Sequence, residues 1–87
     1  MIILYSENFK SKVKNLPIEV KKQLKKKLEI MIDNPRHPSL RTKKIKGRGD
    51  NIFEASINMD IRMTWQYIED GIILRNIGEH DDTLKNP

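Results

Sequence analysis

Residues 51–82, NIFEASINMDIRMTWQYIEDGIILRNIGEHDD, decide the fold that this sequence predicts. Three strand-like runs follow one another here, separated by turn residues at 58–60 and 69–71. The first two runs alternate apolar and polar residues, which is typical of strands with one face on a core. The third run, residues 72–77, predicts a strand that is buried on both faces and interrupted by Arg75. We therefore expect three consecutive antiparallel strands.

The alternation assigns the side chains of the first two strands to opposite faces. The face expected against the core carries Phe53, Ala55, Ile57, Ile61, Met63, Trp65 and Tyr67. The face expected toward solvent carries Glu54, Ser56, Asn58, Arg62, Thr64 and Gln66. Strict alternation in the third strand would put His80 on the side of Ile72 and Leu74. The chain must therefore twist or bulge near Gly78 if His80 is to reach Arg62.

The residues before this sheet predict a first strand and two helices. Ile2–Tyr5 is a short apolar run rich in β-formers, and Ser6 is a suitable N-cap for the next helix. Pro17 breaks that helix and suits the first position of a second one, which the apolar spacing places at Ile18–Asp33. Its apolar stripe consists of Val20, Leu24, Leu28 and Met31, flanked by Ile32.

The predicted fold class is α+β. We expect an N-terminal strand, an antiparallel helix hairpin on the sheet, the three-stranded antiparallel meander and a short polar tail. With 87 residues, of which 37% are hydrophobic, the chain forms one domain spanning residues 1–87. It has no cysteine and only two histidines, so we expect no metal site and no cofactor. No apolar run approaches the ~18 residues of a membrane helix and no basic leader is seen, so we expect a cytoplasmic protein.

The formal net charge of +5 favours an anionic partner, although lysine can also serve only to keep a small domain in solution. The second predicted helix carries a lysine run that is more typical of a solvated helix face: Lys21, Lys22, Lys25, Lys26 and Lys27. A largely non-helical segment is the better candidate for binding phosphate, with a plain surface loop as the alternative. Its basic residues are Arg36, Arg41, Lys43, Lys44, Lys46 and Arg48.

An arginine, a carboxylate and a histidine near one sheet face suit phosphodiester chemistry. RNA can be cut without a metal when its own 2′-OH attacks the neighbouring phosphate, and histidine or a carboxylate can move the protons. Arginine and lysine can hold the phosphoryl oxygens. The alternatives are that Arg62 is a structural ion-pair partner of Asp60 or Glu54, that Glu54 is only a solvated charge, and that His80 only ends the strand. His37, between an arginine and a proline, is more typical of a loop residue.

Three segments resemble the RelE/ParE superfamily of bacterial type II toxins. Residues 37–47, HPSLRTKKIKG, are similar to the family's HP.L..KKLKG segment. Glu54 followed by Asp60, Ile61 and Arg62 is similar to its D-Y-R strand, and residues 77–81, IGEHD, are similar to its vG.HD ending. The order of strand, helix hairpin and meander also matches, so the resemblance covers nearly the whole chain.

The resemblance implies an mRNA endoribonuclease that is silenced by a cognate antitoxin and acts on mRNA, usually at the ribosome, with no membrane partner. By position, Arg62 matches the family's phosphate-binding arginine and His80 its catalytic C-terminal residue, which is a histidine in the YafQ-like and YoeB-like branches. Asp60 matches an aspartate of the YafQ-like branch, and Asp81 either joins the proton relay or orients His80. The RNA-binding residues expected from the resemblance and the basic segment are Arg41, Lys43, Lys44, Lys46 and Arg48.

The sequence departs from the family at two places. Glu54 and Ser56 stand where RelE itself has two lysines, so Glu54 takes the place of a lysine base in the predicted catalytic set. No tyrosine follows His80, although several members use one to stack on a base. Two other functions therefore stay open: a ParE-like inhibitor of DNA gyrase without catalysis of its own, and a degenerate toxin that only binds its antitoxin.

Overall fold

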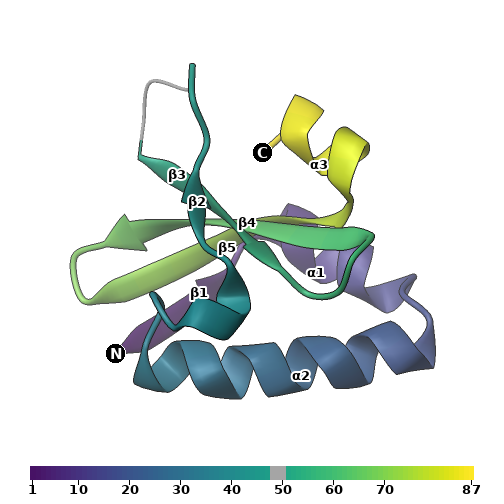
Figure 1. Ribbon diagram of the computed structural model, residues 1–87, viewed down its shortest axis with the longest axis horizontal. Coiled ribbons are helices and arrows are strands. Elements are labelled where there is room, and N and C mark those ends of the chain that lie inside the picture. The colour runs from purple at the N-terminus through teal and green to yellow at the C-terminus, as the bar shows by residue number, and fades with distance from the viewer. Residues whose placement is uncertain (48–50) are drawn as a thin grey trace.

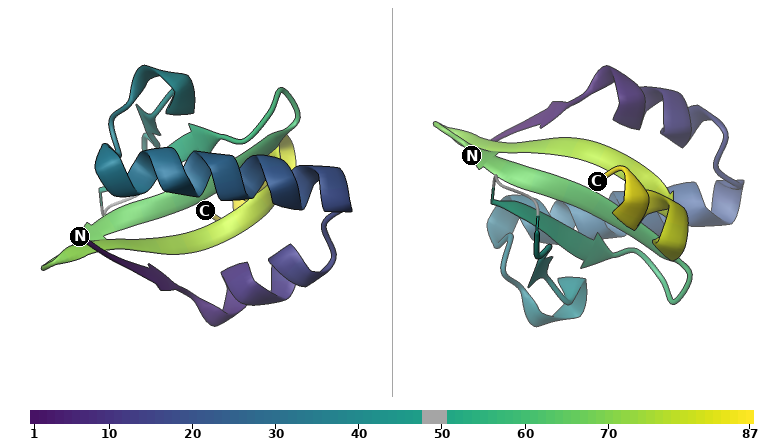
Figure 2. Two further views of the ribbon diagram at one scale, coloured as in Figure 1. Left: turned by 90° about the horizontal axis from the view of Figure 1, so that it is seen from below. Right: turned by 90° about the horizontal axis from the view of Figure 1, so that it is seen from above.

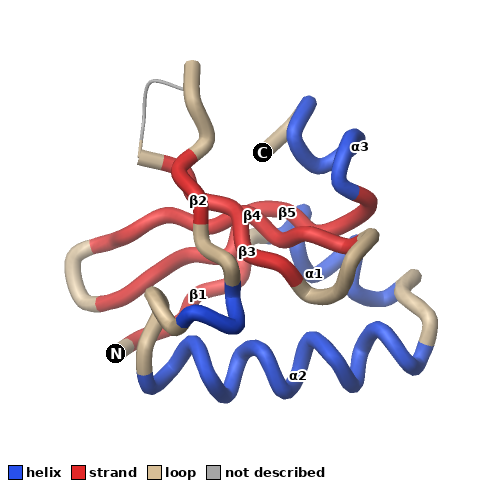
Figure 3. The backbone as a smooth tube through the Cα atoms, viewed as in Figure 1, coloured by secondary structure: helices blue, strands red, loops and turns tan. Residues whose placement is uncertain are grey.

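The computed structural model describes residues 1–47 and 51–87, and its elements form one mixed sheet with helices on both faces (Figures 1 and 3). In chain order the elements are β1 (Ile2–Tyr5), α1 (Glu7–Lys14), α2 (Ile18–Asp33), the 3-10 helix η1 (Pro38–Leu40), β2 (Lys43–Lys44), β3 (Ile52–Ser56), β4 (Ile61–Ile68), β5 (Gly71–Glu79) and α3 (His80–Lys85). The strand order in the sheet is β1-β5-β4-β3-β2. No described helix is long and apolar enough to cross a membrane.

The predicted meander and the α+β class are confirmed. β3, β4 and β5 pair antiparallel in sequence order. β1 pairs parallel with β5, with Ile2 opposite Gly71, and the long connection that parallel pairing requires contains both helices and the strands β2, β3 and β4. A Cβ on Gly71 would lie 1.8 Å from the Ile2 carbonyl oxygen, so only glycine admits this close approach of the two strands. β2, a two-residue strand beside β3, is too short to leave a pattern in the sequence.

The helices begin and end close to their predicted residues. The Ser6 hydroxyl accepts a hydrogen bond from the Phe9 N–H at 3.0 Å, which confirms the predicted N-cap. α2 spans Ile18–Asp33 as predicted, with Pro17 at the N-cap instead of the first helical position. The two views of Figure 2 place α2 across one face of the sheet and α3 on the opposite face.

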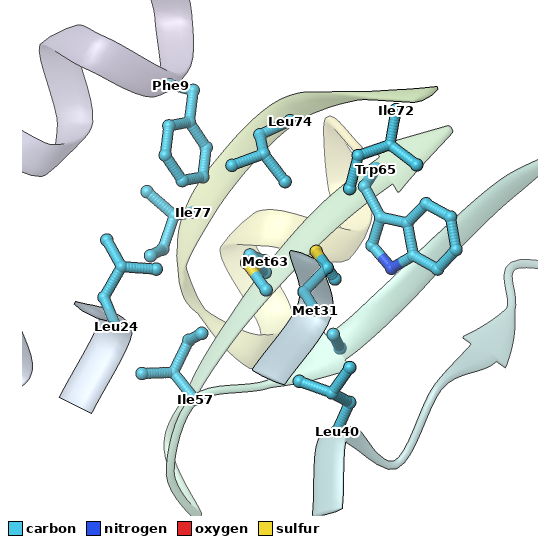
Figure 4. Packing of buried hydrophobic residues seen from close by; sticks show 11 residues of the cluster. Phe9, Leu24, Met31, Leu40, Ile57, Met63, Trp65, Ile72, Leu74 and Ile77 are labelled. Carbon is cyan, nitrogen blue, oxygen red and sulfur yellow. The ribbon is translucent and has the colours of Figure 1, made fainter. Parts of the chain in front are cut away.

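The core lies between the sheet and the pair α1 and α2, and β3, β4 and the residue after β3 contribute four side chains that the alternation predicts, Ala55, Ile57, Met63 and Trp65 (Figure 4). Its buried members are Phe9, Leu24, Met31, Leu40, Ala55, Ile57, Met63, Trp65, Ile72, Leu74 and Ile77. Tyr67, expected in the core, is instead 47% exposed. Its ring packs edge-on against Trp65 at a centroid distance of 5.0 Å, near the β4–β5 hairpin that extends past the end of α2 in Figure 1.

The bulge that the position of His80 requires lies at Arg75, three residues earlier in the chain than the predicted site near Gly78. Thr64 pairs with Asn76 and Trp65 pairs with Leu74, which leaves Arg75 without a partner in the ladder. The Arg75 carbonyl accepts hydrogen bonds from the Ser6 hydroxyl at 2.8 Å and the Asn8 amide at 3.3 Å. The extra residue reverses the alternation after it, so the end of β5 can direct His80 toward the polar face.

The predicted polar tail is wrong, because residues 80–85 form the helix α3, which covers part of the polar face. Asn76 donates to the Asn86 carbonyl at 2.8 Å, Arg75 donates to the Pro87 carbonyl at 3.2 Å, and Thr83 is buried. The polar face was predicted to be exposed to solvent, but part of it is buried. Glu54 is only 8% exposed and Thr64 is fully buried.

Candidate functional site

Arg62 is held in place by the β3–β4 turn. It lies on β4 opposite Ser56 of β3. Its Nη1 donates to three carbonyl oxygens of the turn and the start of β4: Asn58 at 2.6 Å, Met59 at 3.1 Å and Ile61 at 3.3 Å. These bonds fix the guanidinium before any ligand arrives, which is the condition for an effective phosphate clamp.

Asn58 organises this turn and connects it to α2. Its Oδ1 accepts hydrogen bonds from the N–H groups of Asp60 and Ile61, both at 2.8 Å. Its Nδ2 donates to Gln23 Oε1 on α2, also at 2.8 Å. From the sequence, Asn58 was expected in the turn and facing solvent, with no link to α2. The tendency of asparagine to bond its own backbone two residues on is a known turn signal that points to its role here.

Glu54 lies close to both Arg62 and His80, two residues of the predicted catalytic set that strict strand alternation would have put on opposite faces of the sheet. Its Oε1 is 3.9 Å from Arg62 Nε and 3.9 Å from His80 Nε2. The carboxylate is nearly buried, and α3 contacts the neighbouring strands β4 and β5. We call Glu54, Arg62 and His80 the central triad.

His80 is the first residue of α3 and so stands at the end of β5 and the start of a helix. Its N–H donates to the Asp60 carbonyl at 3.1 Å, which joins the start of α3 to the β3–β4 turn. Its ring is about half exposed, and Nδ1 lies 3.8 Å from Asp81 Oδ1. Of the two aspartates in the predicted catalytic set, Asp81 therefore approaches the ring itself, whereas Asp60 meets His80 through its backbone.

Two hollows open beside Met59, whose side chain is 89% exposed and lines both. The first, about 270 Å³, we call the basic pocket, and it is lined by Lys27, Arg41, Ser56, Ile57, Asn58, Met59 and Arg62. The second, about 420 Å³, we call the acidic pocket, and it is lined by Met59, Asp60, Glu79, His80 and Asp81. The basic pocket has three cationic side chains and no carboxylate in its lining. The acidic pocket has three carboxylates beside the histidine.

The predicted RNA-binding residues do not all lie on one surface. Lys43 pairs with Glu54 and Lys44 pairs with Phe53, so the two lysines point to opposite faces and only Lys43 lies on the face of the central triad. Lys46 is exposed after β2, and Arg41 lines the basic pocket. Arg48 lies outside the described residues.

Two further residues of the basic segment support the fold. The Arg36 guanidinium lies 5.3 Å from the centroid of the Phe53 ring, a cation–π contact. The His37 ring nitrogen Nδ1 accepts a hydrogen bond from the Ser39 N–H at 3.1 Å, so His37 caps η1. This is the loop role that the sequence favoured for His37.

The central triad can in principle bind a phosphate and move protons. A guanidinium attracts phosphoryl oxygens, and a carboxylate and an imidazole can each accept or donate a proton. At 3.9 Å, Glu54 and His80 are close but not directly hydrogen-bonded, so each can act on a different atom of a ligand. The described residues contain no group of three or more histidine, aspartate or glutamate side chains that could hold a metal ion.

The solved structures of several toxins have the same fold. The chain superposes on YafQ from E. coli strain BL21(DE3) with a TM-score of 0.73 and 17% identity, over 93% of this chain and 94% of that one. It superposes on a chain of the RelB-RelE antitoxin-toxin complex from Methanococcus jannaschii with a TM-score of 0.77 and 22% identity, over 97% and 99%. For the YoeB/ParE toxin from Agrobacterium tumefaciens the TM-score is 0.78 at 9% identity, over 92% and 99%.

Comparison at the level of sequence finds no family model and no curated protein that matches this chain. The structural similarity spans nearly the full length of both partners in each comparison, so it concerns the whole domain and not a shared substructure. The fold of this chain is therefore that of the RelE/ParE toxins, as its sequence segments predicted.

Proposed function

We propose that this protein is the toxin of a type II toxin–antitoxin system and a metal-independent endoribonuclease that cleaves mRNA in the cytoplasm. The observation that carries the proposal is the position of Glu54, whose carboxylate lies 3.9 Å from both Arg62 and His80. The bulge at Arg75 and the helix α3 serve this arrangement, since together they carry His80 to the polar face.

The reaction is attack of a ribose 2′-OH on the adjacent phosphorus. A bond forms between the 2′ oxygen and phosphorus, the bond from phosphorus to the 5′ oxygen breaks, and the products are a 2′,3′-cyclic phosphate and a 5′-OH. Glu54 takes the proton from the 2′-OH, and His80 in its protonated form gives a proton to the leaving 5′ oxygen. The proton count balances, and the two groups return to their starting forms by exchange with water.

The other residues of the site neutralise charge on the phosphate or position the groups that transfer protons. Arg62 neutralises the phosphoryl oxygens, and its bonds to three carbonyls keep it from reorganising during the reaction. Asp81, 3.8 Å from His80 Nδ1, stabilises the protonated ring and orients it. Asp60 acts as a positioning residue, because its carbonyl holds the backbone of His80.

The basic segment supplies attraction for the RNA backbone. Lys43 lies across the ladder from Glu54 on the face of the central triad, and Lys46 and Arg41 flank it in the sequence. We assign Lys44 and Arg48 to contacts with ribosomal or more distant messenger RNA. Binding that depends on such contacts weakens steeply with salt.

The resting partner of the protein is a cognate antitoxin. Proteins with this fold have been crystallised in toxin–antitoxin complexes, among them E. coli DinJ-YafQ, with a TM-score of 0.75 at 16% identity, and the E. coli RelBE complex, at 0.71 and 21%. The net charge of +5 favours an acidic toxin-binding segment in this antitoxin.

Expression of the wild type beside Glu54→Gln and His80→Ala tests the proposal. The wild type should arrest growth and leave RNA ends that carry a 2′,3′-cyclic phosphate, and both variants should do neither while keeping the wild-type thermal unfolding midpoint. Growth arrest by His80→Ala with the same RNA ends would remove His80 from the mechanism. Arrest with intact RNA and impaired DNA supercoiling in the same cells would instead assign a gyrase target.

A further inference from the structure

The basic pocket contains two cations that the reaction at the central triad does not use. Lys27 comes from α2 and Arg41 follows η1, and both face the same hollow as Arg62. The sequence favoured a solvated helix face for the lysines of α2, and Lys22, Lys25 and Lys26 are exposed as expected. Lys21 and Lys27 are half-buried, and of the five lysines Lys27 lines the basic pocket.

The walls of this pocket are fixed by hydrogen bonds between three elements. Lys27 Nζ donates to the Ser39 carbonyl at 2.9 Å, which ties α2 to η1. Asn58 Nδ2 donates to Gln23 Oε1 at 2.8 Å, which ties the β3–β4 turn to the same helix. The left view of Figure 2 shows α2 with η1 and the β3–β4 turn along the same side of it. The Lys27 ammonium has three donors, so its bond to Ser39 leaves two for a ligand.

Arg41 occupies this position at a conformational cost. Its φ of 49° and ψ of 46° put it in the left-handed region, where it is the one non-glycine residue with positive φ among those described. Glycine or asparagine fits such a position with little strain, whereas other side chains cost about 1–2 kcal/mol. Arg41 is the C-cap residue of η1, and an arginine kept in this strained backbone where it lines a basic pocket points to a use for its charge.

We propose that the basic pocket is a second phosphate site that binds the RNA phosphodiester next to the scissile one, with Lys27 and Arg41 as its ligands. This inference rests on the proposed ribonuclease function and extends it, because Arg62 lines the pocket and also belongs to the central triad. A volume of about 270 Å³ lies just below the ~300–1,000 Å³ of sites for drug-sized molecules, which suits a phosphate with part of its ribose. The second phosphate would fix the register of the RNA, so that the neighbouring 2′-OH meets Glu54.

The test measures binding of a short RNA that cannot be cut because it carries a 2′-deoxy sugar at the scissile position. In a series of such oligonucleotides, one phosphodiester at a time is replaced by a neutral methylphosphonate. The wild type should lose about tenfold in affinity at each of two adjacent positions, the loss expected for one charge-assisted contact. Lys27→Gln and Arg41→Asn should bind the unmodified RNA about tenfold more weakly and lose sensitivity at one of those two positions only.

Two controls keep the outcome clear. Lys26→Gln removes the same charge from the same helix at an exposed residue that does not line the basic pocket, and should keep the wild-type pattern. Lys27→Arg retains a cationic donor and should restore the second sensitive position. Arg41→Asn tolerates the left-handed backbone, so its thermal unfolding midpoint should not fall.

The possible results separate this inference from the proposed function. Two sensitive phosphates in wild type without any RNA cleavage would refute the ribonuclease and support the pocket. Cleavage by wild type with an unchanged pattern in Lys27→Gln and Arg41→Asn would refute the pocket and leave the ribonuclease in place. If these two variants bind RNA normally but lose affinity for an acidic antitoxin peptide, the pocket is a carboxylate site and the inference is overturned.

Discussion

The basic and acidic pockets share one exposed lining residue, Met59, and the charged side chains that line them are of opposite sign. The basic pocket is lined by Lys27, Arg41 and Arg62, whereas the acidic pocket sets His80 among the carboxylates of Asp60, Glu79 and Asp81. A phosphate backbone is attracted to the first and repelled by the second. For the proposed ribonuclease, this difference predicts a direction for the substrate: RNA should enter over the basic pocket, and His80 should reach the leaving oxygen from the acidic pocket.

The largest effect is expected from removing the proton donor while the basic pocket stays intact. His80→Ala should slow single-turnover RNA cleavage by about 10²–10⁴-fold, the usual contribution of a general acid or base. The affinity for uncut RNA should change little, because phosphate attraction lies on the other side of Met59. A parallel loss of affinity would show that the two pockets do not divide binding and chemistry as proposed.

Reversing a charge in the basic pocket should reduce the difference in charge between the two pockets and weaken RNA binding. Arg41→Glu removes one cationic contact and adds a carboxylate, so RNA affinity should fall by about 10²-fold at low salt, and much less at high salt. Lys26→Glu is the matched control, with the same charge change at an exposed site on α2. Equal losses in the two variants would mean that only net charge matters and that the pocket has no specific role.

Asn58 connects the two pockets, so its loss should disturb both. Asn58→Ala leaves the N–H groups of Asp60 and Ile61 without their acceptor and cuts the bond to Gln23. We expect the free energy of unfolding to fall by about 1–3 kcal/mol in denaturant titrations. Asn15→Ala, at an exposed residue after α1, should change it by less than about 0.5 kcal/mol. A stability equal to wild type would show that the turn is held by other contacts.

The smallest effect is expected from neutralising the acidic pocket at its rim. Asp81 is almost fully exposed, so solvent screens its repulsion of RNA. Asp81→Asn should raise RNA affinity by no more than about twofold, measured by titration at low salt. Cleavage should nevertheless decline, because the orienting contact to His80 is lost. A rise in both affinity and cleavage would assign Asp81 a purely repulsive role.

Much of the fold could be predicted because it depends on local patterns. The alternation in β3 and β4, the apolar stripe of α2 and the N-cap at Ser6 are each visible within a few residues of sequence, and each is confirmed. Tyr67 shows the limit of this reasoning. Its place in the alternation is correct, but exposure depends on whether another element covers the end of β4.

The sequence by itself determined the meander, the helix pair and the set of residues with suitable chemistry. Only the tertiary structure decided how that set meets. The bulge at Arg75 is stabilised by Ser6 and Asn8, which are distant in sequence, and α3 is too short and polar to be recognised without the sheet it covers. The physical reason is common to both: a local pattern reports which face a side chain prefers, whereas long-range hydrogen bonds and packing decide where a strand shifts its register. That shift, followed by the start of α3, is what places the His80 ring 3.9 Å from Glu54.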